Sequence, residues 1–375
     1  MARLDKICAI NMGQSPDSST YNEDSNGLPF FQGNADFGEI YPTVRMWCSE
    51  PIKIAREKDV LLSVRAPIGA LNIANCECCI GRGLAALTVN EDICVQEYLW
   101  HVLSSKIDEL NSKGTGSTFK AINKKTLTET EIPLPPLAEQ RKIAAVLDKV
   151  SGLIAKRRQQ LDKLDELVKS RFIEMFGDVI RNSKAWQMRV FEDVAASRLG
   201  KMLDAKQQTG KYSYPYLANF NVQWFRFNIE NLNQMDFDED ERAEFELKDG
   251  DLLVCEGGEI GRCAVWHNEI QPCFFQKALH RVRCNRQIIH PDYLAWWFKY
   301  NCDHDGFTAI AGSKATIAHL PGIKLKQLQV AVPPIELQEQ FATFVAQTDK
   351  SKLAIQKSLQ KLETLKKALM QKYFG

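Results

Sequence analysis

The chain has 375 residues, 45% of them hydrophobic and 25% charged, which is enough apolar material for two sizeable cores. Its 48 Lys and Arg against 47 Asp and Glu leave a formal net charge of +1, which excludes the strongly basic and strongly acidic protein classes but not a local basic surface. No apolar run is long enough for a signal peptide or a membrane span, so we expect a soluble, cytoplasmic protein with no membrane partner.

The first 134 residues have the pattern of a globular domain built mostly from short strands. An amphipathic stretch at 96–110 predicts a helix, and a loop rich in Gly, Ser and Thr follows at 114–122. Hydrophobic runs between turn residues predict the strands, at 7–10, 28–31, 59–64, 70–74, 84–89 and 131–134.

The next stretch, 139–177, predicts one long helix that begins after Pro135-Pro136 and ends at Gly177. Its apolar residues recur at steps of three and four, the pattern of a coiled-coil seam, with Arg157 and Arg171 as interruptions. We predict that the helix packs through Leu147, Val150, Ile154, Leu161, Leu164 and Val168.

The second half of the chain repeats the first. DLLVCEGGEIGRCAV at 251–265 aligns without a gap with DVLLSVRAPIGALNI at 59–73, and the lead-in IPLPPLAEQ returns as VAVPPIELQEQ. A second long helix is predicted at 339–375, packing through Leu359, Leu362, Leu365 and Leu369. The sequence thus predicts an α+β chain with two mixed α/β domains in tandem repeat (1–134 and 181–332) and two helical segments (135–180 and 333–375).

Motifs of catalysis are missing from the sequence. It has no Walker A loop, no glycine-rich dinucleotide fingerprint, no His-Glu-x-x-His and no Gly-x-Ser-x-Gly, so no catalytic residue is assigned. The eleven cysteines are unevenly spaced, as in reduced thiols, and the cluster at 76–79 has no second pair, so no metal site is predicted. The lysines of the last helix fit a solvated face better than a phosphate-binding one.

The repeated order of these features resembles the specificity subunit of type I restriction-modification enzymes. The resemblance rests on the PLPPLAEQ and PPIELQEQ lead-ins, DGDLLVCEGGEIGRCAVW at 249–266 and GTGSTFKAI at 114–122, and it covers essentially the whole chain. It implies two target-recognition domains joined by an antiparallel pair of helices, and double-stranded DNA as ligand. It also implies two methyltransferase subunits and restriction or translocase subunits as partners. S-adenosylmethionine, ATP and Mg²⁺ would belong to those partners, so this chain itself would bind no cofactor and perform no chemistry.

The geometry of duplex DNA fits the same interpretation. Two scaffold copies related by a pseudo-two-fold axis match the dyad of duplex DNA, and helices of about 30 residues span roughly 45 Å, slightly more than one turn of B-DNA. Because the loops differ between the halves, the two half-sites should differ and the target should not be palindromic.

Forked donors, amides and cations on loops are the groups that contact bases and phosphates. In the first domain we predict DNA contacts by Gln14, Gln32, Asn34, Arg65, Ser117, Thr118 and Lys120. In the second domain the predicted contacts are Lys201, Asn219, Asn221, Gln276, Lys277, His280, Lys314 and Thr316. The aromatic run Trp224, Phe225 and Phe227 either stacks on bases or belongs to the core, and the core is favoured.

Two other functions stay open from the sequence. One is a helical scaffold or adaptor that assembles partners without reading DNA, and the other is an enzyme whose active site follows none of the known motifs. Binding to a random pool of DNA duplexes distinguishes a DNA-binding protein from a scaffold or adaptor. Modification or cleavage of DNA by the isolated chain would indicate an enzyme.

Overall fold

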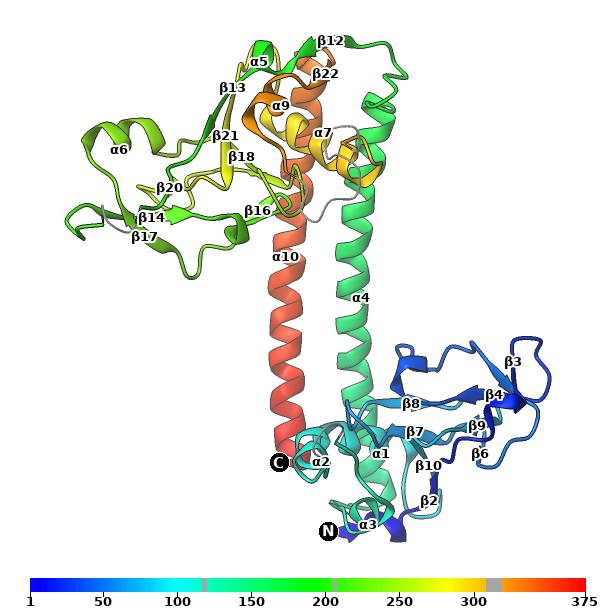
Figure 1. Cartoon of the computed structure of the whole chain (residues 1–375). Coiled ribbons are helices and arrows are strands. Elements are labelled where there is room, and N and C mark those ends of the chain that lie inside the picture. The colour runs from blue at the N-terminus through cyan, green and yellow to red at the C-terminus, as the bar shows by residue number, and fades with distance from the viewer. Residues whose placement is uncertain (117–119, 205–207, 308–318) are drawn as a thin grey trace. The chain divides into compact units, whose positions relative to one another are not determined.

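The computed structural model describes residues 1–116, 120–204, 208–307 and 319–375 (Figure 1). By spatial contact the chain divides into two compact units, Met1–Gln159 with Gln356–Gly375, and Gln160–Ile355. Each unit therefore contains one globular domain and one part of each long helix. The domain boundaries predicted from sequence remain predictions, because this division runs through the helices instead.

In the first unit an antiparallel four-stranded sheet is the centre of the domain. Its edge strand β2 leads into the loops described below, and the inner strand β7 is fully buried, as its apolar sequence requires. The strand order is β2 (Cys8–Met12), β10 (Leu84–Val89), β7 (Val60–Ser63) and β8 (Leu71–Ile73).

A second, smaller sheet of the first unit contains one parallel pair, β4 with β9. Its strand order is β3 (Tyr21–Asn22), β5 (Trp47–Cys48), β4 (Leu28–Phe31), β9 (Cys78–Ile80) and β6 (Ile54–Ala55). A short antiparallel pair joins the two ends of the domain, β1 (Ala2–Arg3) and β11 (Glu131–Ile132).

Helices of the first domain close one face of the four-stranded sheet. The stretch predicted as one helix over 96–110 is two, because the helix breaks at Lys106. The core between sheet and helices includes Leu62, Leu87, Leu99 and Leu103, all fully buried. The helices are α1 (Gln96–Ser105), α2 (Ile107–Ser112) and α3 (Lys124–Thr128).

The domain of the second unit repeats this plan. Its antiparallel sheet has the order β13 (Ala195–Leu199), β21 (Leu279–Cys284), β18 (Leu252–Cys255) and β19 (Cys263–Val265). Its small sheet again has a parallel pair, in the order β17 (Asn233–Asp236), β14 (Ser213–Leu217) and β20 (Phe274–Phe275). The remaining pairs are β12 (Gln187–Val190) with β22 (Gln329–Val332), and β15 (Val222–Gln223) with β16 (Arg226–Phe227). The helices are α5 (Phe191–Val194), α6 (Glu239–Phe245), α7 (Pro291–Asp303) and α9 (Gly322–Lys326).

The two long helices are α4 (Leu137–Phe176) and α10 (Ile335–Phe374), each 40 residues long. In the first unit Arg158 pairs with Glu363 at 2.8 Å, and Leu147 shares a core with Phe374. In the second unit Lys352 pairs with Asp165 at 2.6 Å, and the rings of Phe172 and Phe341 lie 5.5 Å apart. In both units, residues that come later in α4 contact residues that come earlier in α10. This order confirms that the two helices pack antiparallel.

The seam between the helices follows the predicted stripe with one correction. Leu147 and Val168 are fully buried and Val150 and Ile154 nearly so. Five further predicted positions are half-buried: Leu161, Leu164, Leu359, Leu362 and Leu369.

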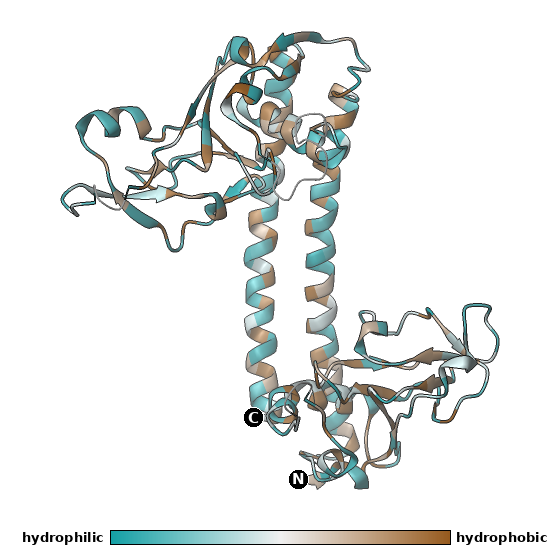
Figure 2. Cartoon of the chain, in the orientation of Figure 1, coloured by the Kyte–Doolittle hydropathy of each residue, from teal (hydrophilic) through white to brown (hydrophobic). Residues whose placement is uncertain are grey.

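Leu365 was predicted for the seam, but 47% of it is exposed. The positions of a coiled-coil seam alternate in steps of three and four residues. Leu359 to Leu362 is a step of three, so a second step of three, to Leu365, leaves the seam. A step of four leads to Lys366, which is half-buried, and Leu369 then follows three residues later. Figure 2 shows hydrophilic residues over most of both helices with hydrophobic ones recurring along them. Within the described ranges, no helix combines the length and the apolar character that crossing a bilayer requires.

Candidate nucleic-acid interface

Four segments of the first domain meet where its two sheets join. The backbone N–H of Gly13, after β2, donates to the carbonyl of Leu84, and that of Gln14 donates to the carbonyl of Ile80. The N–H of Gly83 donates to Gln32 O, and that of Val64 to Gly83 O. Loops at the ends of β2, β4, β7 and β9 are therefore held together by backbone hydrogen bonds, which makes their side chains a defined surface.

Two glycines permit this close approach. A Cβ at Gly13 would lie 2.2 Å from Gly81 O, and a Cβ at Gly83 would lie 2.4 Å from Gln32 O. Any larger residue would push these strands apart. The second domain also has a glycine at a close backbone approach, since a Cβ at Gly200 would lie 2.3 Å from Gln276 O.

The meeting point in the first domain is hollowed into a groove of about 580 Å³. Three exposed arginines line it, Arg45, Arg65 and Arg82, together with the exposed amide of Gln32. The acidic residues on its lining are Glu23 and Asp36. We call this hollow the arginine groove. Of the predicted contact residues it brings together Gln32, Asn34 and Arg65; Gln14 and Lys120 are exposed but do not line it.

One of the three arginines is committed to an internal role. The guanidinium of Arg45 contacts the carboxylate of Asp36 at 2.5 Å and the carbonyl of Ala35. Asp36 also accepts from the backbone N–H groups of Gln32 at 2.8 Å and Gly33 at 3.3 Å. This network fixes the backbone of the loop after β4 and largely neutralises Arg45.

The other two arginines are available to a ligand. Within the described part of the chain, neither the Arg65 nor the Arg82 guanidinium has a hydrogen-bond or ion-pair partner. The backbone of Arg65 is nevertheless fixed, because its carbonyl accepts from the Ser63 hydroxyl at 2.9 Å and its residue bridges to Ala121. Sequence reasoning missed Arg82 and Arg45. A signal for Arg82 was present, since it aligns with the predicted Lys277 in the repeat.

The strand register defines that alignment. Phe31 pairs with Ile80 across the parallel pair of the first domain, as Leu217 pairs with Phe275 in the second. Arg82 follows Ile80 by two residues and Lys277 follows Phe275 by two, and both are exposed. Among the described residues the ammonium of Lys277 has one recorded polar neighbour, Met202 Sδ at 3.9 Å.

Arg65 has no counterpart of its kind in the second domain. It bridges to Ala121, and the equivalent bridge there joins Gly257 to His319. The side chain of Asn219 turns inward, donating to Gly257 O at 2.8 Å and accepting from Arg262 at 2.8 Å. Gln32, which follows Phe31, is replaced by Ala218, which follows Leu217. The two domains thus share a scaffold and differ in the side chains at its loops.

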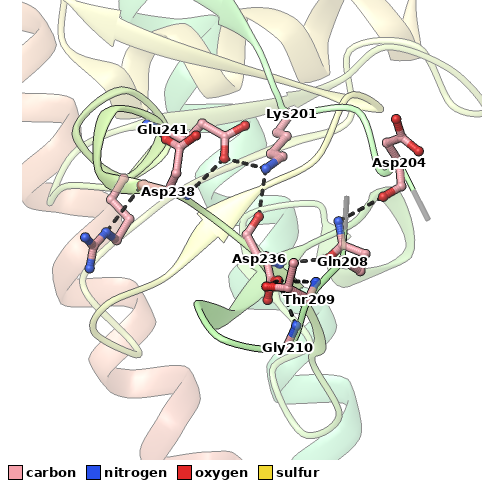
Figure 3. A network of polar contacts seen from close by, with 9 residues as sticks. Lys201, Asp204, Gln208, Thr209, Gly210, Asp236, Asp238 and Glu241 are labelled. Carbon is pink, nitrogen blue, oxygen red and sulfur yellow. Dashed lines mark hydrogen bonds and ion pairs between the residues drawn. The ribbon is translucent and has the colours of Figure 1, made fainter. Parts of the chain in front are cut away.

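Lys201, predicted to contact DNA, instead holds the second domain together. Only 9% of it is exposed, its ammonium donates to Asp236 O at 2.7 Å, and it pairs with Glu241 (Figure 3). The carboxylate of Asp236 accepts from the hydroxyl of Thr209 and from backbone N–H groups, which lowers its pKa. The prediction for Lys201 is therefore replaced by a structural role. A hollow of about 490 Å³ adjoins this network, lined by Lys201, Glu241 and Lys277 among others.

Two further predicted residues are buried. Asn221 and His280 are each 1% exposed. Asn221 accepts from Ala218 N and donates to Asn228 O, while His280 lies 2.9 Å from Leu320 O, and burial lowers the pKa of His280. Neither side chain has surface to offer DNA, so both are reassigned to structure. Gln276 is half-buried, and four predicted residues lie outside the described ranges: Ser117, Thr118, Lys314 and Thr316.

The aromatic run of the second domain divides between core and surface. Trp224 and Phe227 pack against buried clusters, which fits the favoured interpretation. Phe225 is 38% exposed, has a left-handed backbone (φ 60°) and stacks on Trp296 with centroids 4.4 Å apart.

The cysteine cluster consists mainly of buried thiols. Cys78 and Cys79 are fully buried, and burial raises the pKa of the Cys78 thiol to about 12. In the parts of the chain that the structure covers, no group of three or more His, Cys, Asp or Glu side chains is arranged to hold a metal ion.

Comparison with known proteins places the chain among DNA specificity proteins. A family model described as "Type I restriction modification DNA specificity domain" matches residues 1–166 and 183–367. The chain is 42% identical over 165 residues to the putative type I restriction enzyme MjaX specificity subunit of Methanocaldococcus jannaschii, a match covering 44% of this chain and 39% of that protein.

Over a longer stretch it is 21% identical to the type I restriction enzyme EcoBI specificity subunit of Escherichia coli, covering 99% of this chain and 84% of that one. Among solved structures, the S subunit of a type I restriction-modification system from M. genitalium has a TM-score of 0.64 at 14% identity, covering 100% of this chain and 95% of that chain. This last likeness shows a shared fold. The match to the M. jannaschii relative spans less than half of that relative's length.

Proposed function

Because the chain belongs to the family of type I restriction modification DNA specificity domains, we propose that it is the sequence-reading subunit of a type I restriction-modification complex. Its ligand is double-stranded DNA with a bipartite, non-palindromic target. Each domain reads one half of that target. The chain performs no chemistry of its own.

The observation that carries this proposal is one scaffold, present twice, with different side chains at equivalent loop positions. Arg65 corresponds to Gly257, Gln32 to Ala218 and Gln14 to Lys201, although the strands that hold them pair in the same order. A protein that recognised one partner twice would keep these positions alike. Two different recognition surfaces on one framework instead suit two different half-sites.

The long helices are proposed to set the length of the unspecified spacer between the half-sites. Each is 40 residues long, or about 60 Å at 1.5 Å per residue, and the two pack antiparallel in both units.

The chemistry belongs to partner subunits in this proposal. Two methyltransferase subunits dock at the equivalent helix starts, around 135–141 and 333–341, and restriction or translocase subunits join them. S-adenosylmethionine, ATP and Mg²⁺ are then cofactors of those subunits.

Selection of bound duplexes from a random pool tests the function, using the full chain together with its methyltransferase subunits. We expect two different short sequences at a constant separation. A palindrome, a single half-site or no enriched sequence would contradict the proposal; an assembled complex that enriches nothing would favour an adaptor. Native mass measurement under saturating methyltransferase should give two such subunits per chain, and one would contradict the docking proposal.

A further inference from the structure

The loops that form the arginine groove and the equivalent loops of the second domain share one exposed cation but differ at Arg65 and Gln32, which separates base-reading residues from phosphate-binding ones. We propose that Arg65 reads a guanine in the half-site of the first domain, whereas Arg82 and Lys277 are paired anchors for the DNA backbone, one in each domain. This assignment rests on the proposed function and deepens it.

The anchoring role follows from what the two domains share. Arg82 and Lys277 occupy the same position of the repeat, two residues after the parallel strand, and both are exposed. A positive charge alone can hold a phosphate, so both arginine and lysine can fill this role, although arginine can add a second hydrogen bond. A group required by any DNA sequence should appear in both domains, as this cation does.

The reading role follows from what they do not share. Arg65 has Gly257 as its counterpart, and Gln32 beside it on the arginine groove has Ala218. A guanidinium presents two parallel N–H donors that fit the O6 and N7 acceptors of guanine, a fit that a lysine does not reproduce. The Arg65 guanidinium is present in the first domain only. It is therefore suited to reading a base in the half-site that only the first domain recognises.

The geometry at Arg65 supports a precise contact. Its carbonyl accepts from the buried Ser63 hydroxyl at 2.9 Å, and the next residue, Ala66, donates its N–H to Lys120 O at 3.1 Å. The base of the side chain is thus fixed while the guanidinium is exposed and lacks a partner among the described residues. Arg45, by contrast, is paired with Asp36 and is not assigned to DNA.

The experiment compares Arg65→Lys, Arg65→Ala, Arg82→Lys, Arg82→Ala and Lys277→Ala in the full chain with its methyltransferase subunits. All three positions are exposed, so the variants should fold; thermal unfolding of each checks this. Duplex selection and binding at several salt concentrations are measured for each.

Arg65→Lys keeps the positive charge, so we expect the salt dependence of binding to stay the same. The preference for the correct base pair at one G·C position of one half-site should fall about 5- to 150-fold. Arg65→Ala should lose the same discrimination. Arg82→Ala and Lys277→Ala should weaken binding to every sequence alike and reduce the slope of log K against log salt by about one each. Arg82→Lys should behave as the unaltered protein.

Unchanged base preference in Arg65→Lys and Arg65→Ala would overturn the reading role. A changed target sequence in Arg82→Ala or Lys277→Ala would overturn the anchoring role. Failure of the proposed function itself appears differently, as the absence of any selected sequence in the unaltered complex.

Discussion

Gln338 makes in its unit the same three side-chain hydrogen bonds that Gln140 makes in the other. Its Oε1 accepts from His290 N at 2.8 Å, and its Nε2 donates to Ile288 O and Pro333 O. Gln140 accepts from Val95 N at 2.9 Å and donates to Ile93 O and Pro135 O. Both glutamines are fully buried in the first turns of the long helices, so each one fastens a helix to its domain.

Replacing either glutamine by alanine should destabilise the protein by about 2–3 kcal/mol, because a buried N–H and two carbonyls lose their partner and a cavity is left. Denaturant unfolding measures this. Gln159→Ala, at an exposed position of the same helix, is the matched control and should change the free energy of unfolding by less than about 0.5 kcal/mol. Equal effects at Gln140 and Gln159 would show that the buried network contributes nothing.

The seam between α4 and α10 can be tested with two adjacent residues. Val168 is fully buried and Leu167 is 48% exposed. Val168→Lys places an unpaired charge in the seam and should destabilise by about 3 kcal/mol. Leu167→Lys adds the same charge to the solvated face and should be nearly neutral. Thermal unfolding of the two variants decides, and similar melting temperatures would contradict the assigned seam.

Acidification should weaken the fold through its histidines. Burial is the main cause that lowers the pKa of His290 to about 4, and Arg286 adds to it. The unfolded chain takes up this proton near pH 6.5, the folded chain only near pH 4, so stability is present above pH 6.5 and is lost as the pH falls below it. Burial also lowers the pKa of His101, despite the 2.7 Å hydrogen bond that joins it to Asp148 and opposes the shift.

His290→Asn isolates this effect, because asparagine can still cap α7, where His290 Nδ1 accepts from Asp292 N. We expect the variant to lose less stability than the unaltered protein between pH 7 and pH 5, measured by denaturant unfolding. Burial raises the pKa of Asp292, and this shift makes acidification stabilise the fold, opposite to the effect of His290. Asp292 is therefore kept in both the unaltered protein and the His290→Asn variant, so that its contribution cancels in the comparison. His304→Asn, at an exposed histidine, serves as control; a pH response reduced as much in this variant would refute the role of His290.

The spacer role predicts the effect of lengthening both helices. Inserting seven residues after Leu161 and seven after Ile355 keeps the apolar stripe in phase and adds about 10 Å to each helix. If the helices set the spacer, the unspecified bases should increase by about three while both half-sites stay the same. Duplex selection measures this, and a folded variant with its original spacer would rule the role out.

Independent reading by the two domains predicts the outcome of an exchange. Replacing residues 1–134 by the corresponding domain of another family member should change one half-site only. The reason is that each domain has its own core and its own loop surface. Selection experiments that find both half-sites altered would show that the domains do not read independently.

Much of this architecture follows from the sequence because its causes are local or periodic. Steps of three and four along 147–168 predict a helix with one apolar face wherever the chain lies. The matched segments at 59–73 and 251–265 predict two copies of one sheet, and the two sheets have the same strand order. The period also explains the error at Leu365, since two leucine steps of three were counted where the stripe requires a step of four to Lys366.

The roles of single loop residues were decided only by the tertiary structure. Lys201 is a cation on a loop, as a DNA contact would be, but its side chain pairs with Glu241, which is 40 residues away in the sequence. No feature of the sequence near Lys201 predicts this pair. Burial of Asn221 and His280 likewise depends on segments distant in sequence. The arginine groove joins Arg45, Arg65 and Arg82 only because backbone hydrogen bonds bring four loops together at Gly13 and Gly83. Periodicity determines which residues face a core, whereas the meeting of distant loops determines which side chains remain free to bind.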